Sequence, residues 1–322
     1  MNRLQGRVAL IVGAGGQDGR LLAAHLRRVG VITHEIHREF FRDVDGKILA
    51  FSVLNPDDVA KVIARLVPDY VFYLAAHHSS SQSDPLMSSR EAYDLFHKAH
   101  VVGLHSCLEA VRLHSTKSRI FYASSSLIFD GSNGPVQNEE TLASPVGFYG
   151  LTKLQGMMLC REYRKSYSVF TSSGILYSHE SAFRSKSFLS TRIIHGVYEI
   201  AKGRGGKIAV GDLDAINDWG YAEDYVRAFL NVLLTDQPQD YIISSGEGHT
   251  VKEFAALVCG YFGLELADCV YGDPSLLRRK VSTRIGDHSK LTRDTGWKPL
   301  HRFDEMVNRL IEDHLQRDRH VM

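Results

Sequence analysis

The sequence predicts an α/β fold, a doubly wound parallel sheet followed by a smaller C-terminal lobe. The first half of the chain alternates short apolar runs, rich in β-branched residues, with longer amphipathic stretches. Continuous apolar strands separated by helices are typical of a parallel sheet covered on both faces. A glycine-rich turn follows the first apolar run directly, and 322 residues suffice for a large domain with a smaller appendage.

Each element follows from its pattern of apolar residues. The apolar runs predict strands at 8–13, 31–36, 70–76, 119–126 and 169–177. The amphipathic stretches between them predict helices at 19–30, 55–67, 90–113 and 149–167. After residue 178 the pattern loosens, and we expect a short strand-like segment at 241–247 and helices at 218–234, 251–263 and 303–317.

Composition excludes several classes of protein. Lys and Arg total 38 against 37 Asp and Glu, so no net field favours nucleic acid or an anionic membrane as partner. No apolar run approaches the roughly 18 residues of a membrane span, and glycines interrupt the first run too early for a signal peptide. We therefore expect a cytoplasmic protein whose four cysteines are reduced and mostly buried.

Three glycines after the first predicted strand point to a dinucleotide. Gly13, Gly16 and Gly19 have the spacing G-x-x-G-x-x-G and open directly onto a predicted helix. Glycine permits a tight turn and a close approach of the backbone to a diphosphate, which then lies on N–H groups at the helix N-terminus. The context predicts a Rossmann-type domain over 1–177, to which 211–245 returns, and a smaller discontinuous substrate-binding lobe over 178–322.

The end of the second predicted strand bears on the choice of cofactor. An acid normally binds the ribose 2′-hydroxyl of NAD at this place. This chain has His37 and Arg38 there, with Glu39 next to them. A cation suits a 2′-phosphate, so NADP is favoured over NAD, although Arg38 as an ordinary surface charge leaves both open.

A tyrosine and a lysine form the second chemical motif. Tyr149 and Lys153 are four residues apart on a predicted helix and so lie on one face, within mutual reach. A nearby cation lowers a tyrosine pKa, which makes the phenol a usable acid and base. The preceding strand ends in Ser124, Ser125 and Ser126, three hydroxyls that a purely structural strand would not need.

These motifs together resemble the extended short-chain dehydrogenase/reductases, and in particular the GDP-mannose 4,6-dehydratase family. The segments that carry the closer resemblance are "GQDG" (16–19), "LAA" (74–76), "SGILYSHES" (173–181), "GDLDAINDWGYAEDYV" (211–226), "GEGHTVKEF" (246–254) and "GDHSKLTRDTGWKP" (286–299). The resemblance implies an NAD(P)-dependent enzyme in which Ser125 stands at the catalytic threonine, Tyr149 is the base and Lys153 is its partner.

The same resemblance implies further contacts. For the cofactor they are Gly13, Gly16, Gln17, Asp18, Gly19, Arg38, Ser52, Leu74, Ala75 and Ala76, besides Tyr149 and Lys153. For the substrate they are His77, Leu127, His179, Glu180, Arg192, Asn217 and one of Arg278 and Arg279. The implied substrate is a nucleotide diphosphate sugar, with a GDP sugar favoured, and no spacing indicates a metal site.

Several positions depart from the family pattern. The family has a glutamate two residues after its catalytic threonine, where this chain has Leu127, and that glutamate is the base for the C5 proton. Asn217 replaces an arginine, Ser52 replaces an aspartate at the adenine, and the segment 38–49 is shorter than the family's loop.

We therefore predict an oxidoreductase that transfers hydride at C4 of a GDP sugar. The alternatives are a 4,6-dehydratase with a relocated base, for which His77 and His78 are the first candidates, a 4-keto reductase, a 4-epimerase, or a catalytically silent sensor. The predicted helices 90–113 and 149–167 should pair with their copies in a homodimer. The short 38–49 segment argues against a tetramer.

Overall fold

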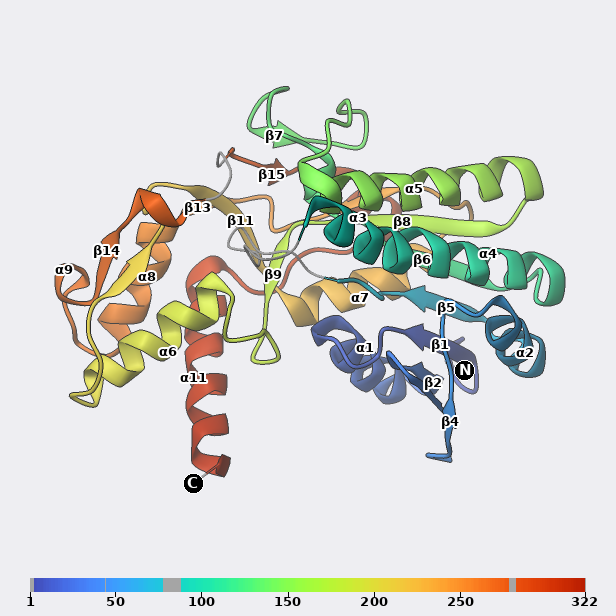
Figure 1. The fold of residues 1–322 in the computed structure, drawn as a ribbon, viewed down its shortest axis with the longest axis horizontal. Helices are drawn as coiled ribbons and strands as arrows, with labels where there is room; N and C mark the ends of the chain where they lie inside the picture. The colour runs from blue at the N-terminus through green and yellow to red at the C-terminus, as the bar shows by residue number, and fades with distance from the viewer. Residues whose placement is uncertain (1–2, 44, 78–87, 278–281, 322) are drawn as a thin grey trace.

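The computed structural model describes residues 3–43, 45–77, 88–277 and 282–321. Its main feature is an eight-stranded sheet, whose strands lie beside one another in the right half of Figure 1. Six strands are parallel, and the last two form an antiparallel hairpin at one edge. The order is β12 (Tyr241–Ile243), β8 (Phe170–Leu176), β6 (Arg119–Ala123), β5 (Tyr70–Tyr73), β1 (Val8–Val12), β2 (Ile32–Ile36), β3 (Phe40–Arg42) and β4 (Ile48–Ala50).

Helices cover both faces of this sheet, as the apolar strands require. Side chains alternate along a strand, so Leu10 of β1 belongs to one hydrophobic core and Ile11 to the other. The first core includes residues of α2 (Pro56–Leu66), α4 (Gly103–His114) and α5 (Gly147–Tyr167). The second includes residues of α1 (Gln17–Arg28) and α7 (Ala222–Leu233). The predicted doubly wound α/β fold is confirmed.

The predicted helix 90–113 is interrupted. It consists of α3 (Ser89–His97), a π-helical turn over Lys98–Val102, and α4. The turn buries His100, whose Nδ1 lies 2.8 Å from Thr152 Oγ1 and whose ring meets the Tyr149 ring edge-on at 5.1 Å. Such turns occur often at functional sites, and this one packs a histidine behind the predicted catalytic tyrosine.

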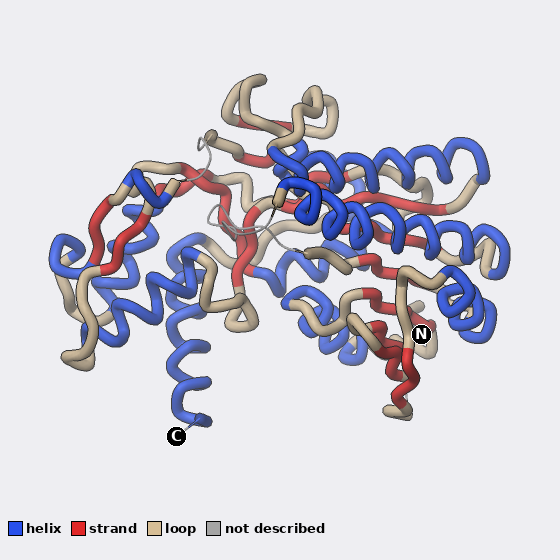
Figure 2. Tube along the Cα trace, in the orientation of Figure 1, coloured by secondary structure: helices blue, strands red, loops and turns tan. Residues whose placement is uncertain are grey.

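The C-terminal part has small sheets and its own core. Trp219, Phe254 and Val307 belong to this third hydrophobic core. The helices and small strands of this part lie on the left of Figure 2. The sheets are β13–β11–β9 (Gly248–Thr250, Ile216–Tyr221, Ser178–Glu180), β10–β14 (Ile208–Val210, Val270–Gly272) and β15–β7 (Ile285–Gly286, Val136–Gln137). The helices are α6 (Leu189–Ala201), α8 (Val251–Tyr261), α9 (Leu266–Cys269) and α11 (Phe303–Val321). The helix α10 (Ser289–Thr295) packs instead on α7 and β12, and its Leu291 belongs to the second core.

The prediction of a helix over 218–234 is wrong at its start. Trp219 and Tyr221 are buried in β11, which pairs with β9, and α7 begins only at Ala222. Trp219 and Tyr221 alternate with other residues as in a strand, but the helical pattern that begins at Ala222 masks this alternation in the sequence. Within the residues that the structure describes, no helix is long and apolar enough to cross a membrane.

Two helical glycines give a matched test of the packing of α5. A Cβ at Gly150 would lie 2.1 Å from the carbonyl oxygen of Leu127, whereas one at Gly260 in α8 would meet nothing within 4 Å. Gly260→Ala should raise the free energy of unfolding by roughly 1 kcal/mol, because alanine favours helix. Gly150→Ala should lower it by about 1–3 kcal/mol through overpacking. Urea unfolding measures both, and a Gly150→Ala protein as stable as the Gly260→Ala protein would contradict the close approach.

Candidate active site

A cavity of about 460 Å³ opens at the carboxyl ends of the parallel strands. This edge is where open α/β sheets bind their ligands, and the volume is typical of a small-molecule site. Most of the residues predicted for the site line it. They are Gly13, Gly16, Gln17, Asp18, Gly19, Leu74, Ala76, Ser125, Leu127, Tyr149, Lys153, His179, Glu180, Arg192 and Asn217.

The glycine turn has the geometry that a diphosphate needs. Gly13 has φ +93°, and a Cβ there would lie 2.7 Å from the backbone nitrogen of Ala75. A Cβ at Gly19 would lie 2.5 Å from the Gly13 carbonyl oxygen. Gly16 is the N-cap of α1 and supplies no side-chain cap. The first N–H groups of α1 therefore face the cavity without a capping side chain, which fits a dinucleotide.

Ser125, Tyr149 and Lys153 come together from β6 and α5. Ser125 follows the end of β6, and its Oγ accepts a hydrogen bond from the Leu127 N–H at 3.2 Å. Lys153 is 2% exposed; its Nζ donates to the Ala123 carbonyl oxygen at 2.8 Å and lies 5.7 Å from the centre of the Tyr149 ring. A hydroxyl, a phenol and an ammonium thus share one wall of the cavity.

The expected effect of Lys153 on the tyrosine is not what the structure gives. Burial raises the pKa of Tyr149 to about 12 and lowers the pKa of Lys153 to about 7. The expectation of a lowered tyrosine pKa is therefore wrong for the protein alone, because desolvation of the phenol outweighs the charges around it. The cation that most opposes the rise in the pKa of Tyr149 is Arg184, which the sequence reading missed.

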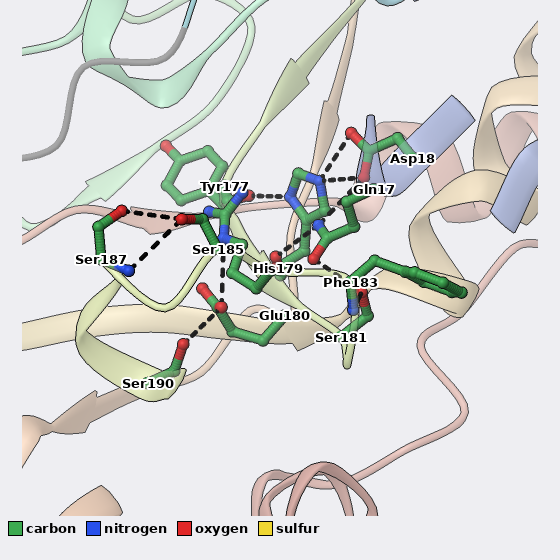
Figure 3. A network of polar contacts seen from close by, with 11 residues as sticks. Gln17, Asp18, Tyr177, His179, Glu180, Ser181, Phe183, Ser185, Ser187 and Ser190 are labelled. Carbon is green, nitrogen blue, oxygen red and sulfur yellow. Dashed lines mark hydrogen bonds and ion pairs between the residues drawn. The ribbon is translucent and has the colours of Figure 1, made fainter. Parts of the chain in front are cut away.

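Asp18 and His179 form an ion pair across the cavity wall (Figure 3). His179 Nε2 lies 3.0 and 3.1 Å from the two carboxylate oxygens of Asp18, and Nδ1 lies 2.7 Å from the Tyr177 carbonyl oxygen. Both nitrogens face acceptors, so the ring is an imidazolium. Burial favours the neutral ring, yet Asp18 holds the pKa of His179 above its ordinary value. The pKa of Asp18, which burial would raise, is lowered to about 2 by His179.

A second charged pair lies next to it (Figure 3). Glu180 is buried, and its Oε2 accepts from Ser190 Oγ at 2.6 Å and lies 3.3 Å from Arg184 Nε. Arg184 also covers the Phe188 ring at 4.0 Å. The Glu180 carboxylate is therefore held by a hydroxyl and a guanidinium at the cavity wall.

Leu127 lies at the cavity on a short 3-10 turn, Ser126–Ile128. Its side chain is mostly buried. Its carbonyl oxygen accepts from the Val146 N–H at 2.8 Å, just before α5 begins. The main chain on both sides thus fixes where this side chain points.

Some predicted residues are not brought to the cavity. Arg38, Ser52, Ala75 and His77 are absent from its described lining. Burial and the charge of Arg38 lower the pKa of His77. His78, Arg278 and Arg279 lie outside the described residues.

Sequence reasoning also missed several lining residues, among them Tyr177, Phe183, Arg184, Asp212 and Arg284. Tyr177 closes the predicted strand 169–177, whereas the other four lie in segments without a regular period. The spacing of Arg184 four residues after Glu180 was the one available signal.

Comparison with known proteins agrees with the fold. Residues 10–310 match the family model of GDP-mannose 4,6 dehydratase. GDP-mannose 4,6 dehydratase 2 of Arabidopsis thaliana is 31% identical over 330 residues, covering 96% of this chain and 87% of that protein. The GDP-mannose 4,6-dehydratase of Vibrio cholerae serotype O1 is 29% identical over 356 residues, covering 96% and 94%.

Solved structures with lower identity show the same fold. RMD from Pseudomonas aeruginosa complexed with NADPH superposes with a TM-score of 0.79 at 20% identity, covering 97% of this chain and 99% of that one. UDP-glucose 4-epimerase of Thermotoga maritima with UDP-glucose gives 0.79 at 18% identity, with the same coverage. The match of the family model over nearly the whole chain shows that this protein belongs to the GDP-mannose 4,6-dehydratase family.

Proposed function

We propose that the protein is an NAD(P)-dependent oxidoreductase of a GDP sugar, a hexose or a heptose, which transfers hydride at C4 and forms or consumes a 4-keto sugar. The observation that carries the proposal is the composition of one cavity wall. Ser125, Tyr149 and Lys153 line it together with the glycine turn, while Leu127 occupies the position where the resemblance leads us to expect a glutamate.

The chemistry follows from these side chains. A nicotinamide cofactor held at the glycine turn supplies the hydride acceptor or donor. Ser125 and Tyr149 hold the C4 oxygen, and Tyr149 exchanges the proton with it. The phenolate that results is partly desolvated, so the nearby Lys153 ammonium stabilises it.

NADP is the cofactor that we favour. Arg38 is exposed just after β2. Glu35, the acid within β2, is paired with Arg27 and lies 3.1 Å from His37 Nε2, so it is already engaged. A cation and an occupied acid suit a 2′-phosphate better than a free 2′-hydroxyl.

Tyr149→Phe tests the proton transfer. The variant should lose at least about a hundredfold in turnover, the usual contribution of a positioned acid or base. It should still bind NADP as tightly as the wild type, because only the phenol oxygen is removed. Like the wild type, it should bind NADP more tightly than NAD. Steady-state rates and fluorescence titration measure this. Activity above a tenth of wild type would show that the proton moves by another route.

Lys153 should make the cofactor-free protein less stable than it would be without this charge. Its pKa falls from 10.5 unfolded to about 7 folded. The unfolded chain therefore binds more protons between these values, and stability should rise with pH across this window, by up to about 1.4 kcal/mol per pH unit.

Lys153→Met should thus unfold at higher urea than wild type at about pH 6.5, with a smaller difference at about pH 9.5. Urea titration without cofactor at the two pH values is the measurement. If Lys153→Met and the wild type differed in urea midpoint by the same amount at both pH values, a buried charge at this position would be contradicted.

Leu127 should prevent dehydration. Once C4 is a ketone, the C5 proton is acidic, but this side chain cannot remove it. We expect a product that keeps its C6 oxygen and takes up little solvent deuterium at C5. Leu127→Glu should introduce measurable exchange or loss of water. Mass spectrometry of products from GDP-mannose and a GDP-heptose in deuterium oxide reads both, and efficient water loss by the wild type would refute the assignment.

The alternatives are weighed by the same residues. A 4,6-dehydratase with a relocated base would need a base beside C5, and His77 does not belong to the described lining of the cavity. A 4-epimerase uses the same triad and differs only in the product. A silent sensor has no use for a half-buried Tyr149 beside a buried Lys153. Reduced cofactor formed on mixing with a GDP sugar excludes the sensor.

A homodimer is the assembly that we propose. The helices α4 and α5 lie side by side on one face of the sheet (Figure 1). Their region exposes apolar side chains, among them Val102, Leu113, Met158 and Tyr167. A second copy of the same two helices would cover them in a four-helix interface.

Light scattering tests the dimer. The wild type should have twice the mass of the chain, and Met158→Glu should shift it toward the monomer. Leu300→Glu, at a position 64% exposed, is the control and should not. A monomeric wild type would exclude the dimer.

A further inference from the structure

A carboxylate stands where the diphosphate of a dinucleotide should lie. Asp18 is in the first turn of α1, directly after the glycine turn, and it lines the cavity. A diphosphate at this helix N-terminus would meet the negative charge of Asp18 at short range, which is unfavourable in a site of low dielectric. The family resemblance makes Asp18 a cofactor contact, but its carboxylate oxygens can only accept hydrogen bonds and so cannot bind a diphosphate oxygen.

The structure gives this carboxylate a dedicated partner. His179 Nε2 lies 3.0 Å and 3.1 Å from its two oxygens, so one imidazolium spans both. The ring is fixed from two other directions. Its Nδ1 lies 2.7 Å from the Tyr177 carbonyl oxygen, and its plane stacks on Tyr225 at 4.6 Å.

The pair also joins two parts of the chain that lie far apart in sequence. His179 is in β9, which pairs with β11 of the C-terminal part. Gln17 reinforces the junction: its Nε2 donates to the His179 carbonyl oxygen at 3.1 Å, and its Oε1 accepts from Ser181 Oγ at 2.8 Å (Figure 3). The diphosphate-binding turn of α1 is therefore tied to the strand that lines the substrate side of the cavity.

We propose that His179 is a positioning residue for the cofactor: its imidazolium neutralises Asp18, so that the diphosphate of the dinucleotide is accepted at α1 only while β9 is docked there. This rests on the proposed function, since it requires a dinucleotide at the glycine turn. It removes Asp18 from the cofactor contacts and His179 from the substrate contacts, and it links the binding of the two ligands.

The sign of the charge effects distinguishes this role from simple packing. His179→Gln leaves the Asp18 carboxylate unneutralised and should weaken NADPH binding about tenfold or more. Asp18→Asn keeps the shape and removes the charge, so binding should stay within about threefold of wild type. The double variant should bind more tightly than His179→Gln alone, which loss of packing does not produce.

The chain offers a matched control. His301 Nδ1 lies 3.0 Å from Asp224 Oδ2, the same chemistry at a place that does not line the cavity. His301→Gln should leave NADPH binding at the wild-type value even where it lowers thermal stability. Circular dichroism melts of all variants identify any protein that fails to fold. If His179→Gln does not fold, the isosteric Asp18→Asn variant alone decides the test.

Binding is measured by isothermal titration with NADPH, and with GDP as a probe of the substrate side in the presence and absence of NADPH. In the wild type each ligand should strengthen the other, and His179→Gln should abolish that effect. Asp18→Asn weakening NADPH tenfold, or a double variant as weak as His179→Gln, would overturn the inference. A wild type that binds neither ligand would instead overturn the proposed function.

Discussion

The close packing of α5 on the end of β6 is the constraint on which the site depends. Gly150 and Gly156 let the helix approach so far that a Cβ at either would overlap the Leu127 carbonyl oxygen or the Tyr122 hydroxyl. This contact sets Tyr149 and Lys153 of the helix against Ser125 of the strand end. It also brings the π-helical turn with His100 onto the far side of Tyr149. A one-residue shift of the helix would remove all of these relations together.

The charges around the cavity follow two regimes. Asp18 is paired with His179 and Glu180 with Arg184, so each partner offsets part of the desolvation penalty of the other. Lys153 contacts a carbonyl oxygen and two aromatic rings but forms no ion pair with a described residue, and burial lowers its pKa to about 7. A buried ammonium at this position destabilises the fold, which fits our proposal that a negative charge forms beside it only during the reaction. The two ion pairs fix the positions of their side chains, whereas Lys153 has no counter-ion among the described residues.

Features encoded in adjacent residues could be predicted from the sequence. The apolar run "VALIV", the glycine spacing after it, and Tyr149 with Lys153 on one helix face are local patterns, and the sheet and the described cavity lining agree with them. Interactions between distant segments could not. Asp18 and His179 are separated by 161 positions, and no pattern announces that each engages the other. The sequence reading missed Arg184 because it lies in an irregular loop. It also missed the strand "INDWGY" because this strand runs directly into a helix.

Energetic quantities were harder still to predict than contacts. The proximity of Lys153 to Tyr149 was foreseeable from the spacing, but the direction of the tyrosine pKa shift was not. That direction depends on how completely the phenol is desolvated, which only the packing of α3, α5 and the π-helical turn determines. Spacing rules give distances along one helix and nothing about what covers it.

The same packing is consistent with our proposal that the group at position 127 differs from the family's while hydride transfer is kept. The N–H of Leu127 donates to Ser125 Oγ and its carbonyl oxygen accepts from the Val146 N–H, so its backbone is held independently of its side chain. The triad geometry belongs to β6 and α5, and the side chain at 127 only adds a group to the cavity wall. A carboxylate in that nearly buried place would have a raised pKa, the property of a good base near neutral pH. A leucine there keeps the wall closed and dry without supplying that function. Under our proposal, oxidation at one carbon and elimination at its neighbour are separable activities, controlled by different side chains on one fixed main chain.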